Sequence, residues 1–175
     1  RAQAHGAVWP REQSALIVVY EYPFHESIRT MLRLEQLFGR LDLLRSRDHA
    51  VDHHFALATL FEIMDVAARA DLKSDLLLDL DRQRSQLAAY RGNPSISEAA
   101  LDAAVTSINT AWQALNALPG KAGQSLTTNE GLMSIRSRIS IPGGTCSFDL
   151  PGYHAWQQGP VEQRKADLER WIAGF

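Results

Sequence analysis

The sequence has few of the features that mark secreted and membrane proteins. Its 175 residues contain a single cysteine, Cys146, so no disulfide can form within the chain and a reducing compartment is expected. No segment approaches the roughly 20 consecutive apolar residues that a membrane-spanning helix requires. No signal peptide is recognisable either. We therefore expect a cytoplasmic protein without membrane insertion.

The chain also lacks a large excess of charge of one sign. Its formal net charge is −2 at pH 7, which is unfavourable for binding nucleic acid or an anionic membrane over a broad surface. Hydrophobic residues make up 45% of the chain and charged residues 22%, and such values are typical of a globular domain with a packed core. We expect one domain and no nucleic-acid partner.

One strand is predicted near the start of the chain. Residues 1–13 show no hydrophobic periodicity and are interpreted as a leader. Residues 14–22 include the apolar run ALIVVY, which is rich in β-branched side chains and predicts a strand that ends at Pro23. A single strand leaves its backbone N–H and C=O groups unpaired. Because no second strand is recognisable, this strand is expected to pair with a missing sheet or a partner chain.

Residues 23–175 are predicted to form a helical domain, because apolar residues recur there at three- and four-residue spacing. Helices are expected from about residue 25, over 49–70, over 72–90, after Ser97, around 132–139, after Pro151 and from about residue 160. Residues 119–128 are predicted to be a polar loop. Such helices joined by short loops predict a mainly α fold, a bundle of about six to seven helices with one N-terminal β-strand.

A histidine group stands at the start of the second predicted helix. His49 and His53 lie four residues apart and share a helix face with a spacing that metal sites use, and His54 follows. A zinc site needs three or four ligands, however, and neither an HExxH pattern nor a suitably spaced cysteine is present. We interpret the group as solvated histidines at a polar helix start, and predict no metal and no cofactor.

The Pro142-Gly143-Gly144 segment superficially resembles a phosphate-binding loop. A Walker loop needs a lysine that reaches the phosphates, and no lysine follows here. The glycines more simply allow a tight turn with positive φ. After this turn we expect Phe148 and Leu150 to fold back onto the bundle.

Cys146 and His154 raise an alternative function, a thiol-dependent hydrolase or transferase. A nearby base could activate the thiol of a cysteine in a glycine-rich loop. The sequence offers no third group that would orient the histidine, and a separation of eight residues says nothing about geometry. We interpret Cys146 as a structural, partly buried residue and predict that the protein is not an enzyme.

Arginines form the most informative polar pattern. Arg29 and Arg33 lie four residues apart on the first predicted helix, Arg40 continues approximately the same side, and Arg136 and Arg138 precede the glycine turn. Like charges at this spacing cost a few tenths of a kcal/mol, so helix stability does not explain the pair. Guanidinium groups bind carboxylates in bidentate fashion, including those of acidic peptides. Solvated arginines paired with Glu26 or Glu35 are the alternative.

Several segments together resemble the ZapD family of bacterial cell-division proteins. The most specific is SIPGGTCSFDLPGYHAW, residues 140–156. Three others follow the same family in the same order: YEYPFHESIRTMLRLEQL, LFEIMDVAARADLKSDLLLDLDRQ and LERWI. The resemblance covers roughly residues 19–172, is weak over 95–128 and is absent from the leader.

The resemblance implies a homodimer that binds the C-terminal tail of the tubulin-like protein FtsZ and bundles FtsZ filaments at the midcell division ring during septation. It implies neither enzymatic activity nor a cofactor. The family fold places a β-rich domain after the helical one, and we expect that domain to be absent from this chain. By position in the matching segments, the expected tail-binding residues are Arg29, Arg33, Arg69, Lys73, Arg136, Arg138 and His154.

Overall fold

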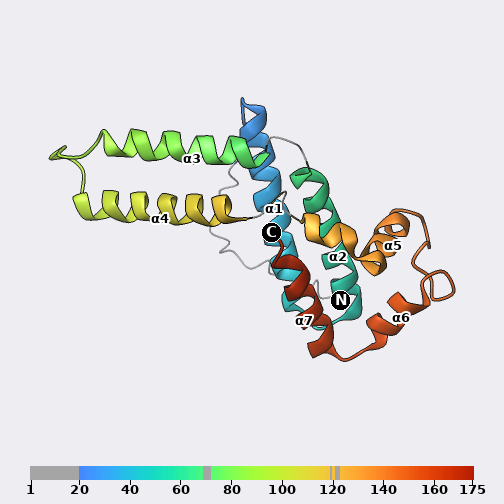
Figure 1. Ribbon diagram of the computed structural model, residues 1–175. Helices are drawn as coiled ribbons and strands as arrows, with labels where there is room; N and C mark the ends of the chain where they lie inside the picture. The colour runs from blue at the N-terminus through green and yellow to red at the C-terminus, as the bar shows by residue number, and fades with distance from the viewer. Residues whose placement is uncertain (1–19, 69–71, 119, 121–122) are drawn as a thin grey trace, which may run out of the picture.

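The computed structural model describes residues 20–68, 72–118, 120 and 123–175 (Figure 1). These residues form seven α-helices and one 3-10 helix. The helices are α1 (Glu26–Ser46), α2 (Ala50–Ala67), α3 (Leu72–Ala88), α4 (Glu98–Ala117), η1 (Gln124–Thr128), α5 (Glu130–Ile139), α6 (Pro151–Gln158) and α7 (Val161–Ile172). The predicted mainly helical fold is confirmed, and no strand occurs within the described ranges.

The predicted strand over residues 14–22 lies mostly outside the described residues. Only residues 20–22 are described, and they are not assigned to a strand. Tyr20 and Tyr22 are exposed, and so is Phe24 just before α1. The rings of Tyr22 and Phe24 contact each other edge to face, with their centroids 5.5 Å apart. The pairing of this segment therefore stays a prediction.

Local sequence explains where several helices begin. The side chains of Ser97 and Asn129 accept hydrogen bonds from backbone N–H groups of the first turns of α4 and α5, at 3.4 and 3.0 Å. Pro151 occupies the first turn of α6, as predicted. Two expectations need correction, because α2 ends at Ala67 rather than near residue 70, and residues 124–128 of the predicted loop form η1.

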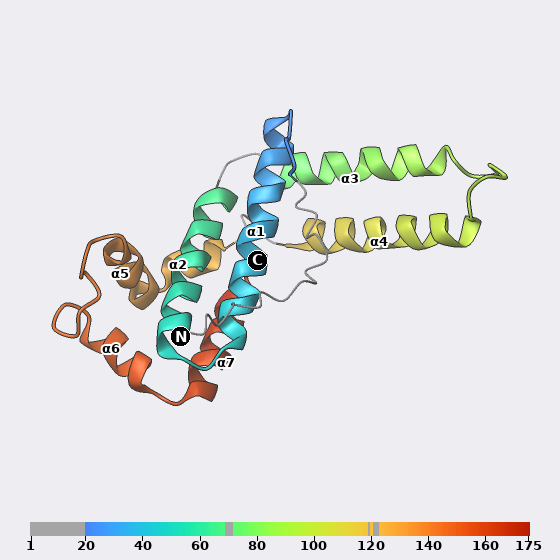
Figure 2. The same cartoon turned by 180° about the vertical axis from the view of Figure 1, so that it is seen from behind.

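Helix α2 lies at the centre of the molecule and contacts α1, α5, α6 and α7 (Figure 2). It is apolar on most sides, as a buried helix must be. Its buried residues are His53, Ala56, Leu57, Thr59, Leu60, Phe61, Ile63, Met64 and Ala67. Phe55 of the same helix is apolar but 53% exposed, because the packed partners leave that part of the α2 surface uncovered.

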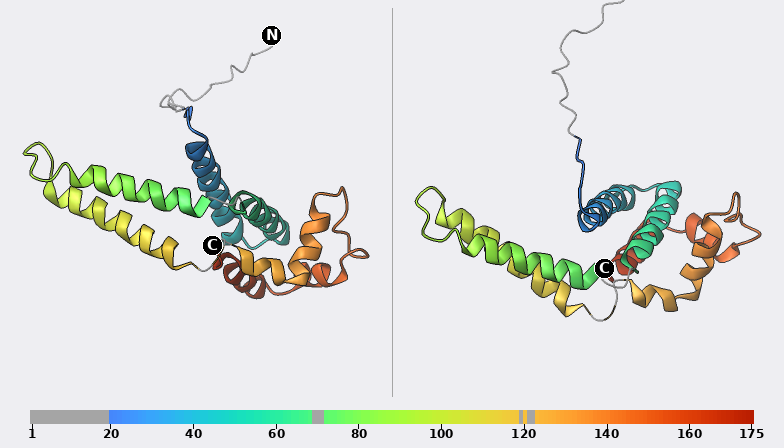
Figure 3. Two further views of the ribbon diagram at one scale, coloured as in Figure 1. Left: turned by 45° about the horizontal axis from the view of Figure 1, so that its top comes forward. Right: turned by 90° about the horizontal axis from the view of Figure 1, so that it is seen from above.

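Helices α3 and α4 form an antiparallel hairpin that projects from the other helices (Figure 3). Helix α3 has no fully buried residue, and in α4 only Leu101 is buried. The predicted bundle is thus divided into a body, made of α1, α2, α5, α6 and α7, and this arm. Among the described helices, none is both long and apolar enough to cross a lipid bilayer.

The glycine turn between α5 and α6 has the predicted geometry at Gly143, whose φ is +69°. Gly144 is required for a different reason, since a Cβ atom there would lie 2.5 Å from the carbonyl oxygen of Arg138. Leu150 folds back into the core as expected, but Phe148 is 82% exposed. Cys146 is exposed rather than partly buried, because only its backbone takes part in the turn.

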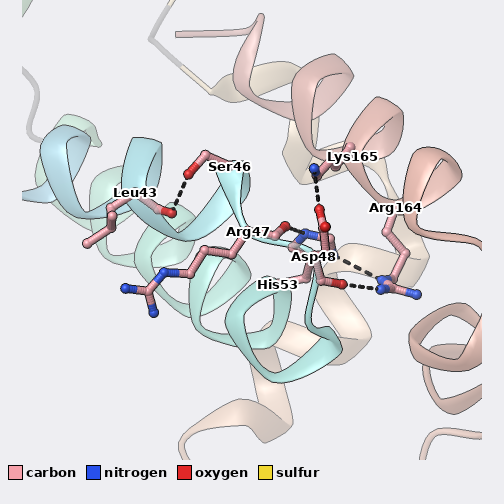
Figure 4. A network of polar contacts seen from close by, with 7 residues as sticks. All are labelled: Leu43, Ser46, Arg47, Asp48, His53, Arg164 and Lys165. Atoms are coloured by element: carbon pink, nitrogen blue, oxygen red, sulfur yellow. Dashed lines mark hydrogen bonds and ion pairs between the residues drawn. The ribbon is translucent and has the colours of Figure 1, made fainter.

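A partly buried polar network joins the α1–α2 turn to α7 (Figure 4). Arg164 of α7 is 5% exposed, and its guanidinium donates hydrogen bonds to His53 Nδ1 at 3.0 Å and to the backbone oxygens of Asp48, Gln157 and Gly159. His53 is fully buried, and its Nε2 donates to the Arg47 carbonyl at 2.7 Å. The expectation that the histidines are solvated is therefore wrong for His53. Its hydrogen bonds connect the α1–α2 turn to Arg164 of α7.

The network makes stability depend on pH. Burial lowers the pKa of His53, and the neighbouring cations Arg164 and Lys165 lower it further, against an opposing hydrogen bond to the Arg47 backbone. The unfolded chain therefore takes up a proton below the ordinary histidine pKa of about 6.5 while the folded chain does not. The free energy of unfolding is consequently expected to fall as the pH decreases below that value.

Urea unfolding at about pH 7.5 and about pH 5.5 measures this dependence. His54, whose pKa burial also lowers, contributes with the same sign. A His154→Gln variant is the control, because His154 is exposed and outside the network, so its pH dependence should equal that of the wild type. Equal stability of the wild type at the two pH values would contradict the prediction.

Candidate protein-binding surface

The first arginine of α1, Arg29, lies in the first turn of the helix. Arg29 donates to the Pro23 carbonyl at 3.2 Å and lies 3.7 Å from Glu26, and Arg33 pairs with the same glutamate at 3.2 Å. This is one of the local ion pairs that the sequence offered as an alternative to partner binding. All these side chains remain largely exposed, and exposed pairs of this kind contribute only about 0–1 kcal/mol. An incoming carboxylate can therefore replace the internal one at small cost.

A groove of about 430 Å³ runs between α1 and α2. Its lining consists of Arg33, Gln36, Leu37, Arg40, Glu62, Asp65 and Val66. Arg40 is held there by Thr59 Oγ1 at 2.9 Å and by Glu62 at 2.6 Å. Arg136 reaches Asp65 from α5. Arg33 and Arg40 thus line the groove, and Arg136, which is far away in the sequence, contacts it through Asp65.

A second cleft, with a volume of about 420 Å³, is lined by residues of α5, α6 and α7. Arg138 does not line it but pairs at 2.9 Å with Asp149, which does. His154 is exposed on α6 and is not a lining residue of the cleft. Helix α5 therefore carries Arg136, which pairs with the groove residue Asp65, and Arg138, which pairs with the cleft residue Asp149.

The two remaining predicted residues are not placed at either hollow. Lys73 donates to the backbone oxygens of Leu118 and Asn116 at 2.6 and 3.4 Å, and so joins the base of α3 to the end of α4. Arg69 lies outside the described residues. Arg40 is the residue that the predicted set missed, although its position on the α1 face pointed to it.

The residues considered for chemistry have structural contacts. His49 Nδ1 accepts a hydrogen bond from Val51 N at the start of α2, and the Tyr153 hydroxyl and His54 Nδ1 share a hydrogen bond of 2.8 Å. Within the described ranges, no hydrogen bond joins Cys146 to His154. No group of three or more potential metal ligands occurs in those ranges.

Comparison with known proteins decides which family this helical chain resembles. The family model described as ZapD, a cell division protein, matches residues 32–175. The chain belongs to the ZapD family. Proteins named cell division protein ZapD from Ralstonia pickettii (strain 12J) and Cupriavidus necator are 59% and 58% identical to it over 155 and 156 residues. The Cupriavidus metallidurans protein of that name is 55% identical over 155 residues.

These matches cover 89% of the chain but 62% of each of those ZapD proteins. The family model spans α1 from its second turn to the end of α7, so it includes both the groove and the cleft. The ZapD resemblance that the sequence motifs indicated is confirmed, and with it membership in a family of cell-division proteins.

Proposed function

We propose that this chain acts in cell division by binding the C-terminal tail of FtsZ. The tail binds to the arginine-rich surface of the chain around the groove between α1 and α2. Two such sites on a homodimer cross-link and bundle FtsZ filaments at the midcell ring in the cytoplasm. The observation that supports this most is that Arg33 and Arg40 of α1 line one groove, while Arg136 of the distant helix α5 pairs with the groove residue Asp65.

Binding at this surface is an exchange of ion pairs. In the unbound chain Arg33, Arg40 and Arg136 pair with Glu26, Glu62 and Asp65. A carboxylate-rich tail replaces these internal partners, so each contact adds little and the single-site affinity is low. Two sites on one dimer raise the affinity for a filament through the effective concentration of the second tail. Weak monovalent binding together with strong binding to polymers is the expected result.

Isothermal titration with a synthetic FtsZ tail peptide tests the proposal on this chain. We expect one site per chain, with an affinity that falls as the NaCl concentration rises from about 50 mM to about 300 mM, because salt screens exposed charges. A tail peptide with its carboxylates replaced by amides is the control and should bind weakly or not at all. Absence of binding at low salt, or an affinity independent of salt, would contradict the proposal.

Neutralising the internal partner of Arg136 should strengthen binding. In an Asp65→Asn variant, Arg136 loses its competing carboxylate, and the affinity for the tail peptide should rise about two- to fivefold, the value of an exposed ion pair. Asp42→Asn is the matched control, because Asp42 pairs with Arg45 away from the groove. Titration of both variants under identical salt conditions measures the effect. A loss of affinity in Asp65→Asn would show that Arg136 is not a tail contact.

A further inference from the structure

The cleft between α5, α6 and α7 is built from aromatic and aliphatic side chains. Leu132, Ile135 and Leu150 are buried at its floor, and the half-buried rings of Trp156 and Trp171 form its wall. The Trp156 ring centroid lies 5.8 Å from that of Trp171. The cleft is therefore an apolar hollow with indole rings at its edge.

The aromatic rings are held in place by polar anchors. Trp156 stacks on Tyr153 with ring centroids 5.6 Å apart and an interplanar angle of 17°. Its indole Nε1 donates to Asp167 at 3.0 Å, and the Tyr153 hydroxyl is hydrogen-bonded to His54. Ring orientations fixed in this way leave a preformed cleft, and preformed clefts bind at a lower entropic cost than mobile ones.

Two polar side chains that line the cleft are already engaged. The Asn129 side chain caps α5 through Leu132 N at 3.0 Å, and Asp149 pairs with Arg138. The contacts that the cleft offers are consequently mainly apolar ones. Its volume of about 420 Å³ lies within the range of ligand pockets, about 300–1,000 Å³, and is large enough for one or two side chains of a peptide.

The guanidinium beside the cleft indicates which peptide fits. Arg138 pairs with Asp149, which lines the cleft. Across α5, Arg136 faces the groove through Asp65. A helix is about 10 Å across and an extended chain advances about 3.3 Å per residue, so about three or four residues connect the two sides. A peptide that complements both the cleft and these arginines thus needs an apolar side chain with carboxylates within a few residues of it.

We propose that this cleft binds an apolar side chain, aliphatic or proline, of the acidic FtsZ tail, while Arg138 and Arg136 bind the carboxylates that flank it. The inference rests on the proposed function and adds a chemical requirement to it. Charge alone does not account for binding, because an acidic peptide without an apolar residue leaves the cleft empty. The aromatic wall makes the tail contact specific, and the arginines orient it.

The tryptophans report occupancy of the cleft directly. A Trp9→Phe/Trp112→Phe variant of the 175-residue chain retains Trp156 and Trp171 as its only indoles, and both line the cleft. Titration with a synthetic FtsZ tail peptide should shift or quench their fluorescence, with the same midpoint that calorimetry reports. A peptide with its apolar residues replaced by serine and its charges kept should leave the emission unchanged.

Filling the cleft should prevent binding without removing any charge. Ser134 is an exposed lining residue of α5, and a Ser134→Leu side chain occupies space that the guest side chain needs. We expect the affinity to fall at least about tenfold, the effect of excluding one apolar side chain. Ser137→Leu is the matched control, because Ser137 is exposed on the same helix outside the cleft, and its affinity should stay within about twofold of the wild type.

Gly152→Leu provides a second filling variant if Ser134→Leu fails to fold, since a Cβ atom at Gly152 meets no other atom within 4 Å. Equal affinity of a folded filling variant and the wild type, with unchanged indole emission on binding, would overturn the cleft assignment while leaving tail binding intact. A tail peptide that binds neither the wild type nor any variant would overturn both proposals.

Discussion

Replacing Arg164 by methionine is expected to lower the free energy of unfolding by about 3 kcal/mol or more. The substitution keeps most of the apolar stem but removes all the hydrogen bonds of the guanidinium. It leaves the buried His53 Nδ1 and the partly buried backbone oxygens of Asp48 and Gly159 without this donor. Unsatisfied buried acceptors each cost about 1–3 kcal/mol. The contact between the α1–α2 turn and α7 is lost with them.

Urea unfolding followed by circular dichroism measures the loss. Arg170→Met is the matched control, because the Arg170 side chain is 70% exposed and pairs only with Asp167 on its own helix, and its stability should change by less than about 0.5 kcal/mol. Arg164→Lys should fall between the two variants, since an ammonium group keeps the charge but lacks the planar fork of donors. Similar stabilities for Arg164→Met and Arg170→Met would show that the network is energetically unimportant.

Reversing the charge of both Arg33 and Arg138 is expected to abolish co-sedimentation with FtsZ polymers. Each arginine is about half exposed and none of its hydrogen bonds supports the buried core, so the variant should stay folded and keep the oligomeric state of the wild type. Each reversal replaces an attraction to the tail carboxylates by a repulsion. Two reversals at separate sites should act nearly additively and reduce the affinity by about a hundredfold.

The two single variants, Arg33→Glu and Arg138→Glu, distinguish the groove from the cleft. Arg82→Glu is the matched control, because Arg82 is exposed on the arm, where it pairs only weakly with Asp79 at 3.5 Å. It carries the same change in net charge and should bundle filaments as the wild type does. Normal bundling by both single variants would show that the tail binds elsewhere on the chain.

The helices were predictable because their signals are local. Spacing of apolar residues located most of the described helices, Pro151 indicated α6, and the caps at Ser97 and Asn129 are contacts within one turn. The positive φ of Gly143 is likewise a property of a few neighbouring residues. An error arose where neighbours in space decide the outcome, as at Phe148, which is apolar but uncovered.

The candidate site was predictable only in part. The sequence identified Arg33, Arg136, Arg138 and His154 as a set, mainly through the resemblance of their segments to the ZapD family. It did not show that Arg136 pairs with a residue of the groove and Arg138 with a residue of the cleft. Periodicity gives the face of a helix on which a side chain lies, whereas the partner of that face depends on how distant helices pack.

By itself, the sequence determined the helical class, most helix boundaries, the family and the basic residues available to a partner. The tertiary structure alone decided that α3 and α4 form an arm, that His53 is buried against Arg164, and that an aromatic cleft opens beside Arg138. The physical reason is the range of the interactions. Helix propensity and capping act within about four residues, while burial, buried hydrogen bonds and clefts arise between segments that only folding brings together.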